Sequence, residues 1–186
     1  MSSALDLAHQ LHQQFTGVLA PPVEFRGEIS VSLNKASRLS EVMQYVQSTL
    51  AFDMLLDITS IDHFGSEPRF EIVYHLYSFT SHQYLRIKVL VSEENPEISS
   101  VTNLWPAADW HEREVFDMMG IRFKGHPDLR RILMWDEYPH YPLRKEFPLA
   151  GLPTTEWVKP APMAGGPFVT SPGEKPTIDR EPRSKG

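Results

Sequence analysis

The spacing of apolar residues along the chain predicts a helix at the start. Four apolar residues recur there at helical spacing: Leu5, Ala8, Leu11 and Phe15. Spacing of three and four residues places such side chains on one face of a helix. Ser3 and Asp6 are spaced as a capping box, which predicts that the helix begins beside them. Gly17 suits the end of this helix.

The period of the pattern changes to two residues after Pro21 and Pro22. The apolar positions are all odd-numbered: Val23, Phe25, Ile29, Val31 and Leu33. The even-numbered positions between them are charged or hydroxylated. Strict alternation indicates a half-exposed strand, so one strand is predicted over residues 23–33 with all five apolar side chains on one face.

The rest of the first 136 residues continues this mixture of periods. A second helix is predicted from about residue 37, with the apolar stripe Leu39, Val42, Met43, Val46 and Leu50. Residues 54–62 predict a buried strand, and residues 69–77 and 84–91 predict a hairpin in which Glu71 faces Arg86 or Lys88. A third helix is predicted over residues 106–119, with Gly120 at its end. The predicted fold class is α+β, with helices packed on one mixed or antiparallel sheet.

The character of the chain changes near residue 137. Ten of its sixteen prolines lie in residues 139–186 with few aliphatic residues between them, so this segment cannot offset its own ordering entropy by burial. It keeps the spaced anchors Trp157, Phe168 and 147–149. We therefore predict an α+β domain over residues 1–136 and an extended Pro-rich tail over residues 137–186 that wraps partner subunits. A tail without function is the alternative.

Composition and charge exclude several functions. The chain has no cysteine, which excludes disulfides, catalytic thiols and cysteine-ligated iron–sulfur clusters. Its formal net charge is −6 and it has no basic patch, which argues against nucleic acid and anionic lipid as partners. The N-terminal segment lacks the pattern of a secretory signal or transit peptide, and no apolar run reaches the about 20 residues that span a bilayer.

The densest polar cluster lies on the third predicted helix. It comprises Asp109, His111, Glu112, Arg113, Glu114 and Asp117. Arg113 and Asp117 are spaced as i,i+4 neighbours, so we expect them to pair. Trp110 and Phe116 are interleaved with these charges, which favours a partly buried network at an interface over the alternative, a solvated charged face.

Catalytic and metal-binding interpretations of this cluster have weaker support. His111 and Glu114 have i,i+3 spacing and need His126 or Asp128 as a third ligand, and they do not form the His-Glu-x-x-His pattern. The neighbouring carboxylates are candidates for acid–base chemistry, but Arg113 among them favours their ionised form. The sequence therefore predicts no catalytic, cofactor-binding or metal-binding residue, and a stand-alone metal enzyme remains an alternative.

The loop after the third helix is rich in arginine and aromatic residues. Residues 125–131 combine turn formers with Arg130 and Arg131, and residues 132–135 return to apolar side chains ending in Trp135. Arginine, tryptophan and tyrosine dominate the energetically important positions of protein interfaces. We predict that this loop contacts a partner, with an ordinary surface loop as the alternative.

The run EREVFDMMGIRFKGHPDLRRIL, from Glu112 to Leu133, resembles the signature of the thirty-kilodalton subunit family of respiratory complex I. The matching positions are Glu112, Arg113, Glu114, Asp117, Met118, Met119, His126, Arg130, Ile132 and Leu133. The segments SIDHF at 60–64, SVTNLWPAADW at 100–110 and YPLRKEFPL at 141–149 also resemble that family. The resemblance covers roughly residues 37–150.

The resemblance implies a non-redox scaffold subunit in the peripheral arm of a proton-pumping NADH:quinone oxidoreductase. FMN and Fe–S clusters are then expected in partner chains and no cofactor in this one. The implied partners are the quinone-reducing subunit of complex I and neighbouring Fe–S subunits, on the cytoplasmic side of a bacterial inner membrane, with membrane contact only through the complex. The equivalent subunit of a membrane-bound hydrogenase or another NADH-type complex is the alternative.

One hypothesis joins the resemblance to the residues. We expect one network, inside the domain or against the quinone-reducing subunit, formed by Glu112, Arg113, Glu114, Asp117, His126, Arg130 and Arg131. Removal of Arg113 is then expected to leave buried carboxylates without a counter-charge.

Overall fold

The computed structural model describes residues 3–151. The predicted anchors Trp157 and Phe168, with most of the predicted tail, lie outside the described residues. The elements are α1 (Ala4–Gln14), β1 (Val23–Phe25), β2 (Glu28–Leu33), the 3-10 helix η1 (Ala36–Arg38), α2 (Leu39–Ser48), β3 (Met54–Asp62), β4 (Phe70–Ser78), β5 (Gln83–Val91), β6 (Glu97–Ser99), α3 (Ala108–Met119) and β7 (Arg122–Lys124).

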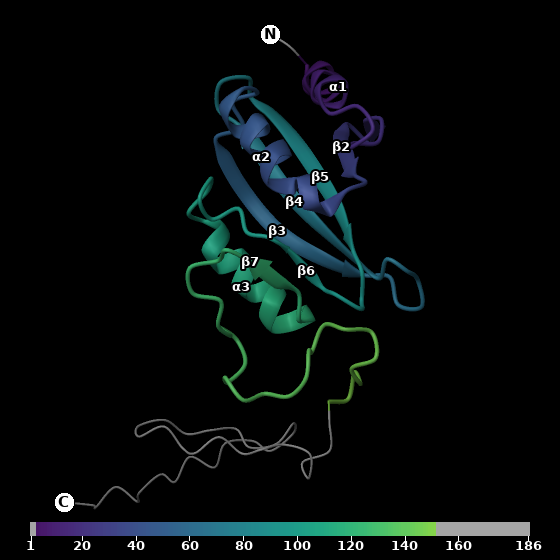
Figure 1. The fold of residues 1–186 in the computed structure, drawn as a ribbon, viewed down its shortest axis with the longest axis vertical. Coiled ribbons are helices and arrows are strands. Elements are labelled where there is room, and N and C mark those ends of the chain that lie inside the picture. Colours follow the sequence, from purple (N-terminus) through teal and green to yellow (C-terminus); the bar gives the residue numbers. More distant parts are fainter. Residues whose placement is uncertain (1–2, 152–186) are drawn as a thin grey trace, which may run out of the picture. The chain divides into compact units, whose positions relative to one another are not determined.

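A five-stranded mixed sheet is the centre of the fold, with the strand order β1-β2-β5-β4-β3. Strands β2 and β5 are parallel, and the other neighbours are antiparallel. Helix α2 lies across one face of this sheet (Figure 1). Helices packed with a mixed sheet confirm the predicted α+β class. The small parallel pair β6-β7 was not predicted, because strands of three residues show no period.

Helix α1 begins where the sequence predicts. The Asp6 backbone N–H donates to Ser3 Oγ at 3.1 Å, and the Ser3 N–H donates to Asp6 Oδ2 at 2.9 Å. This reciprocal capping box satisfies two N–H groups that a helix end otherwise leaves unpaired. The buried side chains are Leu7, Ala8 and Leu11.

The prediction of one strand over residues 23–33 is wrong. Arg26 and Gly27 have φ of 53° and 79°, so they form a two-residue turn between antiparallel β1 and β2. Val23 pairs with Ser30 in this hairpin and therefore shares its face. Val23 and Phe25 consequently project away from the core and are 58% and 65% exposed. A primed hairpin turn needs positive φ at both central residues, and Arg-Gly is a weaker signal for it than Asn-Gly.

The bounds predicted for residues 54–62 are correct, but the predicted burial is wrong. Strand β3 is an edge of the sheet, and its register shifts between Leu55 and Asp57. Its side chains Met54, Leu56 and Ile61 are partly exposed. An apolar β-branched run predicts a strand but does not specify whether that strand is central or at an edge.

The central hairpin and the helical core are as predicted. Strands β4 and β5 pair along their whole length, and Lys88 Nζ lies 3.4 Å from Glu71 Oε1 across them. The apolar stripe of α2 is buried, and α3 ends at Gly120 with φ of 77°. A Cβ at position 120 would lie 2.6 Å from the ring of Tyr141. Glycine is therefore required here both by the positive φ and by the lack of space for a side chain.

The first compact unit of the chain runs from Met1 to Glu146, and residues from Phe147 onward belong to a second unit. The predicted division between residues 136 and 137 stays a prediction. Within residues 3–151, no helix is long and apolar enough to cross a membrane.

Candidate functional site

Asp117 on α3 binds the backbone of the following loop. Its Oδ2 accepts hydrogen bonds from the N–H groups of Ile132, Leu133 and Met134 at 3.0, 2.7 and 2.9 Å. Its Oδ1 accepts from Arg131 Nη1 at 2.6 Å. The side chain is fully buried. One carboxylate therefore satisfies three consecutive backbone donors and a guanidinium.

These contacts determine the charge state of Asp117. Burial opposes ionisation, but the N–H groups of Met134 and Leu133, the Arg131 guanidinium and the N–H of Ile132 outweigh it, so the pKa of Asp117 lies below its usual value. Hydrogen bonds to the charged form of a carboxyl group favour that form. Asp117 is a structural anion.

Arg131 extends the same network to the next segment. It donates to the carbonyls of Asp117 at 2.9 Å, Tyr138 at 2.7 Å and His140 at 3.3 Å. Its Cζ also lies 5.2 Å from the centre of the Tyr141 ring. A planar guanidinium with five donors suits several carbonyls at once. Arg131 thus ties residues 138–141 to α3.

Arg113 makes other contacts than predicted. Its Nε donates to the carbonyl of Arg130 at 3.2 Å, and its Nη1 lies 3.9 Å from Asp109 Oδ1. The predicted pair with Asp117 is not formed, because the loop backbone occupies that carboxylate. Removal of Arg113 therefore takes the counter-charge from Asp109, whose side chain is 37% exposed although its Oδ1 is buried, and not from the fully buried Asp117.

His126 has a structural role in the loop. Its fully buried ring accepts the Asp128 N–H at Nδ1 (3.0 Å), and its Nε2 lies 3.2 Å from the Asp109 carbonyl. Because a carbonyl only accepts, Nε2 carries the proton and the ring is neutral. The loop therefore binds α3 through His126 as well as through Asp117.

The structure does not bring together the ligands of the alternative metal site. His111 Nδ1 lies 3.2 Å from Asp57 Oδ1, whereas His126 binds a different part of α3. Glu114 is exposed. Within residues 3–151, no group of three or more His, Asp or Glu side chains is arranged to hold a metal ion.

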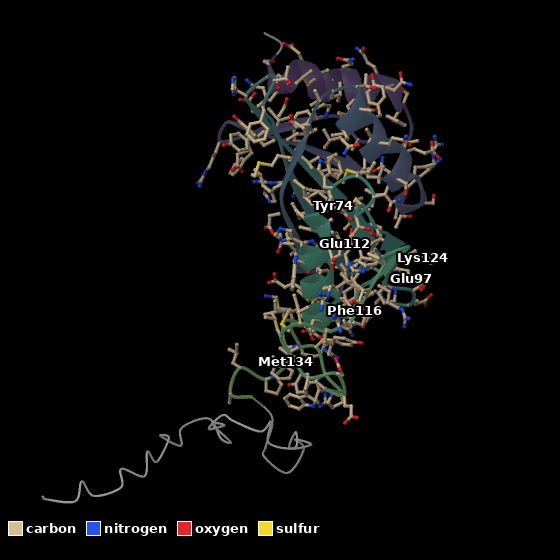
Figure 2. All side chains as sticks on the ribbon, turned by 90° about the vertical axis from the view of Figure 1, so that its left-hand side faces the viewer. Tyr74, Glu97, Glu112, Phe116, Lys124 and Met134 are labelled. Atoms are coloured by element: carbon tan, nitrogen blue, oxygen red, sulfur yellow. The ribbon has the colours of Figure 1, made fainter. Side chains whose placement is uncertain are left out.

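Glu112 points into the core from the other side of α3. Its Oε1 accepts the Val101 N–H at 2.7 Å, and its Oε2 has no partner among the described residues. The hydroxyl of the fully buried Tyr74 on β4 also lacks a partner within residues 3–151, and Figure 2 labels this side chain together with Glu112. Burial raises the pKa of Glu112 to about 7. This member of the predicted network thus lies apart from Asp117 and Arg131.

The substitution Glu112→Gln should remove a pH-dependent loss of stability. Folded Glu112 keeps its proton up to about pH 7, whereas its ordinary pKa is 4.5. The contribution of Glu112 to the free energy of unfolding is therefore fully present below pH 4.5. It falls by about 3 kcal/mol as the pH rises to 7. Denaturant unfolding at pH 5 and pH 8 measures the loss, and the variant should be the more stable protein at pH 8.

The matched control is Glu114→Gln, which removes an exposed carboxylate from the same helix. It should keep the pH dependence of the original protein. If Glu112→Gln keeps the same dependence too, Glu112 is not the group that titrates.

A second buried hub was not predicted. Arg69 donates to both oxygens of Asp62 at 2.8 Å, to Glu93 at 2.5 Å and also to Glu146. The Lys145 N–H donates to Asp62 Oδ2 at 2.8 Å. The hydrogen bonds from Arg69 chiefly keep the pKa of Asp62 low. Because Asp62 and Lys145 are 83 positions apart, no local pattern in the sequence indicates this hub.

Three signature residues and the neighbouring Trp110 are exposed, and we call them the α3 surface: Trp110, Glu114, Arg130 and Leu133. Trp110 is 63% exposed and Leu133 is 58% exposed. The Arg113 guanidinium lies over the Trp110 ring, 5.0 Å from its centre, and makes a cation–π contact with it. Exposed aromatic and aliphatic side chains are typical of protein interfaces when the backbone that carries them is held in place.

Comparison with known proteins gives a consistent result. The sequence model of the family described as "Respiratory-chain NADH dehydrogenase, 30 Kd subunit" matches residues 33–153. An NADH-quinone oxidoreductase subunit of Citrifermentans bemidjiense is 43% identical over 142 residues, covering 76% of this chain and 88% of the relative. The protein of the same name from Roseiflexus castenholzii is 47% identical over 128 residues, covering 68% and 73%.

Two solved structures are also similar. A trypsin-resistant fragment of Nqo5 superposes with a TM-score of 0.58 at 31% identity, covering 65% of this chain and 95% of the fragment. A chain of an archaeal membrane-bound sulfane sulfur reductase gives a TM-score of 0.66 over 77% of this chain and 85% of its own. At 21% identity the second similarity shows a shared fold alone.

Proposed function

This chain belongs to the family of 30 Kd subunits of the respiratory-chain NADH dehydrogenase, and from that premise we propose that it is a non-redox scaffold subunit of a proton-pumping NADH:quinone oxidoreductase. In that enzyme electrons pass from NADH through FMN and Fe–S clusters to quinone. We propose that all of these centres belong to partner chains. The chain itself contains no cysteine with which to ligate a cluster.

The proposal rests on the hydrogen bonds that the polar residues of the signature run make inside the protein. Asp117 and Arg131 bind the loop backbone, and His126 binds α3 through a neutral ring. Groups whose donors and acceptors are saturated inside the protein are poorly suited to proton transfer or metal binding. Their effect is to fix the loop that carries Arg130 and Leu133 against α3, which carries Trp110 and Glu114, and this suits a positional function.

We propose that the α3 surface docks against the quinone-reducing subunit, with neighbouring Fe–S subunits close by. Arg130 is 67% exposed at its side chain, and Trp110 and Leu133 are 63% and 58% exposed. Arginine and tryptophan are enriched among the residues that contribute most to binding. The complex then holds the chain on the cytoplasmic side of the bacterial inner membrane, and residues 137–186 extend over partner subunits.

Affinity purification of the tagged full chain tests the proposal. From detergent-solubilised membranes it should recover chains that carry flavin and Fe–S clusters together with NADH:quinone activity. The chain purified alone should have no such activity and no stoichiometric flavin, iron or zinc. A prosthetic group or turnover in the isolated chain would falsify the scaffold function, and co-purification with a hydrogenase would place it in a related complex.

A further inference from the structure

Seven side chains form one continuous stack in which arginine and aromatic residues alternate. Each of the three guanidinium groups lies over two rings, with its carbon atom between 4.4 and 5.8 Å from each ring centre. A cation within about 6 Å of a ring centre is attracted to the face of that ring. We call this set the arginine–aromatic stack, in spatial order: Tyr138, Arg131, Tyr141, Arg144, Phe70, Arg69 and Phe64.

The stack joins the last part of the first unit to the central sheet. Four of its members belong to residues 131–146, which we call the strap and which contain no helix or strand. At one end of the strap, the N–H groups of residues 132–134 donate to Asp117. At the other end, the Lys145 N–H donates to Asp62 at 2.8 Å. Both carboxylates are fully buried, so the strap is held at each end by an acceptor that water does not reach.

The middle of the strap caps helix α3. The Leu143 N–H donates to the carbonyl of Met118 at 3.1 Å, and Arg144 Nε donates to that of Met119 at 2.8 Å. The last carbonyl groups of a helix have no partner within the helix, so these bonds satisfy acceptors that would otherwise need water. The strap is therefore bound at its middle as well as at its two ends.

The arginines of the stack are shielded from water and share their counter-charges. The side chains of Arg69, Arg131 and Arg144 are 3%, 9% and 19% exposed. Glu146 binds Arg69 and lies 3.9 Å from Arg144, so one carboxylate serves two members. Displacement of one member leaves a shielded cation or a ring without its neighbour. Contacts in such a network are not independent, so we expect the strap to open in one step.

We propose that residues 131–146 open and close as one cooperative unit, which couples the α3 surface to the point at which the chain leaves the first unit. Leu133 of the α3 surface lies at one end of the strap, and Glu146, the last residue of the first unit, lies at the other. Coupling between two sites is reciprocal. A partner bound to the α3 surface thus also fixes the start of the segment after Glu146. Only this consequence rests on the proposed function, because the coupling itself is a property of the isolated chain.

Amide hydrogen exchange of the full chain purified alone, followed by NMR, tests the coupling. The substitution Glu146→Ala removes a carboxylate that is 45% exposed, so the fold should be retained. The reporter amides, those of Lys145 and Leu133, should then exchange about tenfold faster, the effect of losing one hydrogen bond between charged groups. The two factors should be equal, because one opening releases both amides. The amide of Tyr74 in β4 should exchange at its original rate.

Substitution of Tyr141 tests the stack itself. Tyr141→Leu removes the ring that contacts both Arg131 and Arg144, and it should release the two reporter amides by equal factors. Tyr141→Phe keeps a ring for both guanidinium groups and should exchange as the original protein does. The matched control is Phe25→Leu, which removes a cation–π contact on the β1–β2 hairpin, outside the stack. It should leave both reporter amides unchanged.

Three results would overturn the proposal. One is faster exchange of Lys145 with no change at Leu133 in Glu146→Ala, because the two ends would then open separately. Another is unchanged exchange of both reporter amides in Glu146→Ala or in Tyr141→Leu. The third is equal acceleration at Tyr74, which would indicate a loss of global stability and not an opening of the strap. Because no partner takes part in these measurements, their failure leaves docking through the α3 surface unaffected.

Discussion

Replacing Asp117 with alanine is expected to lower the free energy of unfolding by about 3–5 kcal/mol, the usual cost of leaving a buried charge without its partner. The change removes the acceptor of three backbone N–H groups and the counter-charge of Arg131. Arg131 is only 9% exposed at its side chain, so water cannot replace that acceptor without opening the loop. We therefore expect residues 130–141 to detach from α3.

Denaturant unfolding measures the stability, and hydrogen exchange at residues 132–134 measures the loop. Asp117→Asn should lose less stability, because its amide oxygen keeps one acceptor without the charge. Glu114→Ala is the matched control on the same helix, and an exposed substitution should stay within about 0.5 kcal/mol. A loss below about 1 kcal/mol in Asp117→Ala would show that the loop is held by other contacts.

Elements with a long regular period were predictable from the sequence. The stripe of α2 and the alternation in β4 and β5 reappear as buried residues, because one face of each element must leave water. The hairpin of β1 and β2 was not predictable, since the same alternation continues through the turn at Arg26 and Gly27. A two-residue turn reverses the face without breaking the pattern.

The site was predictable as a set of residues but not as a set of contacts. Spacing on the helix favoured a pair between Arg113 and Asp117, yet backbone N–H groups of the loop hold Asp117. The hub at Arg69 depends on residues far apart in the chain, which no local pattern contains. In the sequence, Glu112 cannot be distinguished from its charged neighbours on the helix. Its full burial and its hydrogen bond from the Val101 N–H show that it belongs to the core and not to the network of Asp117.

The second large effect is expected from the α3 surface. In the double variant Trp110→Ser with Leu133→Ser, both side chains are more than half exposed, so the fold should survive with unchanged stability. Each such interface residue contributes about 2 kcal/mol when it is well packed against a partner. Association with the complex should therefore weaken by more than about tenfold for each substitution. Leu90→Ser is the control, with 45% exposure on another face.

The most direct measurement is NADH:quinone activity in membranes of a strain that lacks the native gene and expresses the double variant. The proposal predicts that this activity and the amount of assembled complex fall together, while NADH oxidation by an artificial acceptor at the flavin is retained. Wild-type assembly and quinone reduction by the folded double variant would contradict docking through the α3 surface.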